Sequence, residues 1–162
     1  MLNRLNGIVH IDEYGETTIM NIYYDTPDFR MIRYSLEKPV YKEKLRLRTY
    51  GTPTENSNAF VEIKKKYDGI VYKRRIAMPY DNALAYLAGN TEFDPGSQIS
   101  KEINYLRKSW KNLSPKAVIA YDRTAYAGDS DPDLRITFDR NIRYRTDGLD
   151  LKNGAYGKLL LP

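Results

Sequence analysis

The sequence predicts an antiparallel α+β fold, and three observations support this prediction. Short segments in which charged and apolar residues alternate, as in strands with one buried face, follow one another along the chain. Two of these segments meet at Asp68-Gly69, a dipeptide typical of a two-residue hairpin turn. Two other stretches carry helix signals instead of alternation. Strands that are mostly adjacent in sequence favour an antiparallel sheet over βαβ units.

The first half of the chain contains two predicted strands before the hairpin. Residues 18–26 form a strand that Pro27 ends, and residues 29–36 form a short helix or turn. Residues 42–50, KEKLRLRTY, alternate strictly, and a polar loop covers residues 52–58. The alternation of this second strand separates its cations, Lys42, Lys44, Arg46 and Arg48, from Glu43, Leu45, Leu47 and Thr49 on the other face.

The hairpin over residues 60–77 contains FVEIKKKYDGIVYKRR. With Asp68-Gly69 as its turn, Lys64 lies directly opposite Lys73, and Glu62 lies opposite Arg75. Like charges placed directly opposite each other destabilise a sheet. Such an arrangement is easier to tolerate if an anion sits among these cations.

The second half of the chain returns to strands after two helices. Pro79 and Gly89 bound a helix over residues 79–88. A second helix over residues 98–113 has an apolar stripe and ends at Ser114-Pro115. Strands follow over residues 116–127 and 134–145, and the tail from 146 to 162 has no firm periodicity. We expect residues 1–162 to form one domain.

Composition limits the possible functions. The chain has 162 residues, 26 Lys and Arg against 21 Asp and Glu, and a net charge of +5, which favours an anionic partner. It has no Cys, which excludes disulfides, thiol catalysis and zinc–thiolate sites. No apolar run approaches the roughly 18 residues of a membrane helix, so a cytoplasmic protein is the simplest expectation. Neither a P-loop nor a Gly-x-Gly-x-x-Gly motif occurs, so a nucleotide would have to be held by side chains.

Several predicted strands carry their cations on one face. In residues 134–145, alternation puts Arg135, Thr137, Asp139, Asn141, Arg143 and Arg145 on the same side. Such faces are often simply solvated, but a solvated face usually mixes charges of both signs. Two geometries would supply an anion. The sheet could lie open on a nucleic-acid backbone, or it could curl into a barrel around a phosphate chain.

Four segments in order, YKEKLRLRTYG, FVEIKKKYDGIVYKRR, YDRTAY and LRITFDRNIRYR, resemble the VTC domain of the vacuolar transporter chaperone family. That domain belongs to the triphosphate tunnel metalloenzymes, and the resemblance runs from about residue 19 to the end. It implies an antiparallel β tunnel barrel with flanking helices. It also implies a polyphosphate polymerase that transfers the terminal phosphoryl group of ATP to polyphosphate with Mn²⁺ or Mg²⁺.

When the family's motifs are matched to this sequence, the resemblance implies five catalytic residues. Arg46 and Arg48 match the phosphate-gripping arginines, Lys64 and Lys73 the tunnel lysines of the hairpin, and Arg123 the arginine of the Tyr-x-Arg-x-Ala-aromatic strand. Further candidates for phosphate binding are Lys44, Arg75, Tyr121, Arg135 and Arg143.

The family pattern also contains strands that we expect this chain to lack. One is an N-terminal strand with a catalytic basic residue, and the other is a C-terminal strand with a metal-binding glutamate. The main metal ligand is therefore expected beyond residue 162, and Glu62 is a weak candidate here. A further segment or a second chain would complete the barrel.

Two other functions stay open at this point. Triphosphate hydrolases of the wider superfamily show a Glu-x-Glu-x-Lys strand near the N-terminus, and this sequence has none. The other alternative is a module that binds polyphosphate, triphosphate or nucleic acid without catalysis, with nucleic acid the less favoured ligand.

Overall fold

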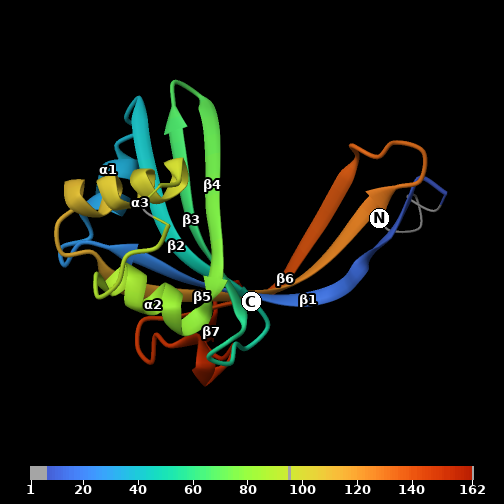
Figure 1. Ribbon diagram of the computed structural model, residues 1–162. Coiled ribbons are helices and arrows are strands. Elements are labelled where there is room, and N and C mark those ends of the chain that lie inside the picture. The colour runs from blue at the N-terminus through green and yellow to red at the C-terminus, as the bar shows by residue number, and fades with distance from the viewer. Residues whose placement is uncertain (1–6, 95, 162) are drawn as a thin grey trace.

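The computed structural model describes residues 7–94 and 96–161, which form one continuous antiparallel sheet with helices on one side (Figure 1). The predicted α+β class is confirmed. The strands are β1 (Val9–Asp25), β2 (Tyr41–Tyr50), β3 (Asn58–Tyr67), β4 (Ile70–Pro79), β5 (Ser114–Gly128), β6 (Arg135–Arg145) and β7 (Lys158–Leu159). The helices are α1 (Arg30–Leu36), α2 (Tyr80–Ala88), α3 (Gln98–Ser109) and the 3-10 turn η2 (Leu151–Asn153).

The seven strands are ordered β4-β3-β2-β1-β5-β6-β7, and every pair is antiparallel. Within the described residues the sheet is open, because its two end strands, β4 and β7, do not pair with each other. The β tunnel barrel, which we expect to be incomplete in this chain, is therefore not confirmed by the described residues. Figure 1 shows the sheet bent into two parts that diverge, with β2, β3 and β4 on one side and the outer halves of β1, β5 and β6 on the other.

The predicted hairpin is confirmed with its register. Asp68 and Gly69 form the turn with positive φ angles of 43° and 82°, as a two-residue hairpin turn requires. Tyr67 pairs with Ile70, and Lys64 pairs with Lys73.

The hydrophobic core lies between the sheet and helices α2 and α3. The core face of β2 and β3 carries side chains that are at most 1% exposed, among them Leu45, Leu47, Val61 and Ile63. The helices supply Tyr86, Ile103 and Leu106 to the same cluster, so most of the hydrophobic burial that stabilises the fold lies on one side of the sheet. Because side chains alternate, the predicted cationic side of β2 faces away from α2 and α3.

The largest differences from the predicted extents lie in β1, α3 and the tail. β1 begins nine residues before the predicted start at residue 18, and a register shift between Ile11 and Glu16 interrupts its pairing with β5. α3 ends at Ser109 rather than at residue 113, and β7 with η2 occupies the tail that lacked periodicity. None of the helices in the described ranges has the length and apolar character needed to span a bilayer.

The prediction for the faces of β6 is wrong in its second half. Ala120 and Asp122 of β5 pair with Arg143 and Arg140, so one residue of β5, Tyr121, stands opposite two of β6, Asn141 and Ile142. Asn141 lies in this bulge with a φ of 50°. One extra residue reverses the alternation that follows it, and Arg143 and Arg145 therefore lie on the face opposite Arg135 and Asp139.

Candidate functional site

Lysines form a row across three adjacent strands on the face away from the helices. Lys44 of β2 pairs with Lys64 of β3, which pairs with Lys73 of β4. All three side chains are exposed, and within the described residues none makes an ion pair. Their mutual repulsion is unrelieved by protein carboxylates, so this row is a site where an anion would be stabilising.

The arginines of β2 lie beside this row and share one carboxylate. Arg46 Nε donates to Glu62 Oε2 at 2.6 Å, and Arg48 Nε lies 3.7 Å from the same oxygen. Arg46 also donates to the hydroxyl of Tyr23, and Arg48 donates to Asn21. Burial alone lowers the pKa of Arg46, but Glu62 and Tyr23 raise it overall, so this guanidinium stays charged.

Arg123 of β5 carries a similar pair on the same face. Its Nε and Nη2 donate to the two carboxylate oxygens of Asp139 at 2.7 and 2.8 Å, and its guanidinium stacks on Tyr121 at 5.2 Å. The hydrogen bonds to Asp139 raise the pKa of Arg123. Such bidentate contacts orient the guanidinium and leave some of its five N–H donors for another acceptor.

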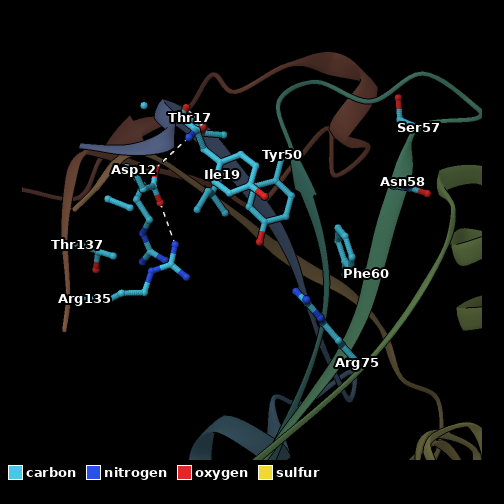
Figure 2. Close-up of a pocket in the computed structure, with 14 residues that line it drawn as sticks. Asp12, Thr17, Ile19, Tyr50, Ser57, Asn58, Phe60, Arg75, Arg135 and Thr137 are labelled. Carbon is cyan, nitrogen blue, oxygen red and sulfur yellow. Dashed lines mark hydrogen bonds and ion pairs between the residues drawn. The ribbon is translucent and has the colours of Figure 1, made fainter. Parts of the chain in front are cut away.

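A cleft of about 900 Å³ opens between the two diverging parts of the sheet. Figure 2 shows Arg75 on one side of it and Arg135, hydrogen-bonded to Asp12, on the other. Arg123, Thr137 and the aromatic residues Tyr50 and Phe60 also line it. The cleft thus combines three guanidinium groups with an aromatic surface.

The predicted site residues fall into two groups in space. Most of them lie on the face of the sheet that bounds the cleft. That group comprises Lys44, Arg46, Arg48, Lys64, Lys73, Arg75, Tyr121, Arg123 and Arg135. Arg143 does not join them, because the bulge in β6 turns it to the other face, where it donates to Asp122 at 2.8 Å.

No group of three or more His, Asp and Glu side chains in residues 7–94 and 96–161 is arranged to hold a metal ion. The candidate Glu62 is 12% exposed and lies against Arg46 and Arg48. Two guanidinium groups beside a carboxylate disfavour the approach of another cation. Glu62 therefore fits an arginine-positioning role better than a metal-ligating one.

The sequence interpretation missed several residues that line the cleft. Tyr50 and Phe60 continue the alternation of Arg48 and Glu62, so the period of two could have placed both on this face. Asp12 could not have been found in that way, because it lies in the irregular part of β1. Its side chain is nearly buried and holds Arg135 at 2.9 Å.

Two comparisons relate the sequence of this chain to known proteins. A family model described as "VTC domain" matches residues 2–159. The Vacuolar transporter chaperone complex subunit 4 of Schizosaccharomyces pombe is 28% identical over 156 residues, an alignment that covers 82% of this chain and 21% of that protein. The chain thus spans about a fifth of the length of this relative.

Proposed function

This chain belongs to the VTC domain family, and on that basis we propose that it transfers the terminal phosphoryl group of ATP to polyphosphate. The observation that carries the proposal is the lysine row of Lys44, Lys64 and Lys73 beside Arg46 and Arg48 on one sheet face. A phosphate chain has the charge density to offset such a row, and arginine binds its oxygens bidentately.

The reaction joins two anions, and the residues present suit that task. A terminal oxygen of the polyphosphate attacks the γ-phosphorus of ATP, the bond from that phosphorus to the β-phosphate oxygen breaks, and ADP leaves. Polyphosphate gains one phosphate unit. Catalysis of phosphoryl transfer rests mainly on positioning and charge neutralisation, which the guanidinium groups of Arg46, Arg48 and Arg123 would supply. No nucleophilic side chain is required.

Glu62 and Asp139 would fix these arginines before the substrate arrives. Each carboxylate occupies only part of a guanidinium, since Arg46 uses Nε for Glu62 and Arg123 uses Nε and Nη2 for Asp139. The remaining N–H groups can bind phosphate oxygens without breaking these pairs. Preorganised donors of this kind require little rearrangement during the reaction.

The tunnel is part of this proposal, and the open sheet defines where it would close. β4 and β7 are the end strands, and β4 is exposed over Ile70–Arg75. An unpaired strand edge binds another strand readily. A further segment or a second chain pairing with these edges would enclose the cleft and complete the domain proposed for residues 1–162.

Mn²⁺ or Mg²⁺ would enter this reaction with the substrate. We place the ion on the phosphates of ATP, where Mg²⁺ is commonly bound. The roles of the lysines and arginines given above do not depend on it.

One incubation tests the proposal: the protein with ATP and Mn²⁺, followed by measurement of long-chain polyphosphate, ADP and free phosphate. Formation of one ADP for each phosphate unit added to the polymer supports the proposal. Free phosphate without polymer would indicate hydrolysis. No product together with tight tripolyphosphate binding would indicate a binding module, and preference for nucleic acid over tripolyphosphate at matched salt would contradict a polyphosphate site.

The variant Arg46→Ala tests the assignment of the phosphate site. We expect it to weaken tripolyphosphate binding at least tenfold, because it removes a charged donor that Glu62 holds in place. Arg74→Ala is the control, since Arg74 lies on the other face of β4 and is half exposed. Equal affinity of both variants at equal fold stability would contradict the assignment of Arg46.

A further inference from the structure

We propose that Tyr50 and Phe60 form a nucleobase platform, so that the cleft selects a nucleoside triphosphate over inorganic phosphate chains. The proposal rests on the proposed function, because it names the part of the same cleft that would hold the base of ATP. Tyr50 and Phe60 are side by side at one end of the cleft, on β2 and β3 (Figure 2).

The ring of Tyr50 is available for stacking. Its side chain is 50% exposed although it lies within the cleft, and it contacts Phe60 edge to face with ring centroids 5.7 Å apart. Ile19, directly opposite Tyr50 on β1, is 2% exposed and supports the ring from the sheet. A supported, half-exposed aromatic ring is what a base stacks on, whatever the identity of the base.

Guanidinium groups flank the platform on both sides. Arg75 lies over the ring of Phe60 at 5.0 Å, and Arg123 lies over Tyr121 at 5.2 Å. Tyr121 is the partner of Ile19 on β5, so Tyr50, Ile19 and Tyr121 form one row across β2, β1 and β5. An apolar floor between cations suits a ligand that has a flat ring and a charged tail.

The phosphates would run along β2 away from the platform. Tyr50 and Lys44 are six residues apart on that strand, which is about 20 Å at roughly 3.3 Å per residue. Arg48 and Arg46 lie between them on the same face, followed by the lysine row. The strand therefore presents, in order, an aromatic ring, two guanidinium groups and a cluster of ammonium groups.

A polar side chain at the edge of the platform could recognise the base by hydrogen bonds. Asn58, the first residue of β3, lines the cleft, and its side-chain amide makes no hydrogen bond within the described part of the chain. An amide offers both a donor and an acceptor to the edge of a base. A bare phosphate chain would use neither this amide nor the apolar ring surfaces beside it.

The test compares affinities for ATP and inorganic tripolyphosphate, measured by calorimetry on the full chain at one salt concentration. We expect the wild type to bind ATP more tightly than tripolyphosphate. Tyr50→Leu should lower the ATP affinity about tenfold and leave the tripolyphosphate affinity within about twofold, because only stacking is lost. Tyr50→Phe should retain wild-type ATP affinity, because the ring remains.

Tyr72→Leu is the matched control, since Tyr72 is 44% exposed on β4 and lies outside the cleft. Thermal melting checks that each variant is folded. An equal loss of ATP and tripolyphosphate affinity in Tyr50→Leu, or no preference for ATP in the wild type, would overturn the base platform. Tripolyphosphate binding by the wild type would then still support the phosphate site, whereas failure to bind either ligand would overturn the proposed function itself.

Discussion

Lys64 of β3 lies directly opposite Lys73 of β4, and neither ammonium group has a carboxylate partner among the described residues. Lys44 adds a third charge on the other side of Lys64. Opposed like charges lower the stability of a sheet, and no apolar contact in the core requires them on this exposed face. An anionic ligand on this row, as we propose, would offset that repulsion.

Lys64→Gln should stabilise the ligand-free protein and weaken its phosphate binding. Removing the central charge relieves repulsion from both neighbours, so we expect the free energy of unfolding to rise by about 0.5 kcal/mol. The affinity for tripolyphosphate should fall about tenfold. Urea denaturation and calorimetry measure the two effects, with Lys111→Gln, at an exposed loop position, as the control. Lower stability without ligand would contradict this account of the row.

Glu62→Gln should disturb two arginines without changing metal dependence. The carboxylate contacts Arg46 at 2.6 Å and Arg48 at 3.7 Å while being only 12% exposed. Its loss leaves two half-buried cations without their counter-charge, so we expect a decrease of about 2 kcal/mol in the free energy of unfolding. The Mn²⁺ dependence of ATP binding should match that of the wild type. A selective loss of that dependence would show that Glu62 does bind the metal.

Arg135→Gln and Arg143→Gln should have different consequences. Arg135 lines the cleft, whereas Arg143 lies on the opposite face of the sheet and donates to Asp122. We expect only Arg135→Gln to reduce tripolyphosphate affinity, about fivefold to tenfold, because it alone removes a charge from the cleft. Arg143→Gln should lower the melting temperature and leave that affinity within twofold. A reversed pattern would show that the bulge in β6 does not set these faces.

Acidification should destabilise the protein through Asp122. Burial raises the pKa of this carboxyl, but donors from Asn141, Thr18 and Arg143 outweigh it and lower the pKa below 3.8, its usual value. A carboxyl whose pKa is lower in the folded state stabilises the protein when the pH is above the pKa of the unfolded state. This stabilisation is lost as the pH falls through the pKa of the folded state. The wild type should therefore lose stability below about pH 4.

Asp122→Asn tests this pH dependence. The variant should be less stable than the wild type near neutral pH. The difference should shrink as the pH falls below about 4 towards the folded-state pKa, because the wild-type carboxyl then takes up a proton and becomes neutral like the amide. Urea midpoints between pH 6 and 3 measure it. A difference that stays constant over this range would assign the effect of Asp122 to hydrogen bonding alone.

The predictable parts of this molecule are those governed by local backbone geometry. The strict alternation of residues 42–50 and the Asp68-Gly69 turn specified which side chains share a face and which stand opposite, down to the pair of Lys64 and Lys73. Both follow from the two-residue period of a strand and from the positive φ angles of its turn.

The two-residue period of a strand does not predict the faces correctly where an irregularity interrupts the strand's pairing. The bulge at Asn141 separated Arg143 from Arg135, and the shift between Ile11 and Glu16 hid Asp12 from a pattern analysis. A bulge depends on how a strand pairs with its neighbour, so the alternation within a single segment does not reveal it. This is why Asp12 and Arg135 meet in the structure but could not be paired from the sequence.

The sequence by itself determined the antiparallel strands, their cationic faces and the opposed lysines, because each depends on a few neighbouring residues. Only the tertiary structure decided that Arg75 and Arg135 face each other across a cleft, that Tyr50 and Phe60 line it, and that the sheet stays open between β4 and β7 in the described residues. The bend that brings these groups together involves strands far apart in the chain, and no local pattern encodes the relative placement of such strands.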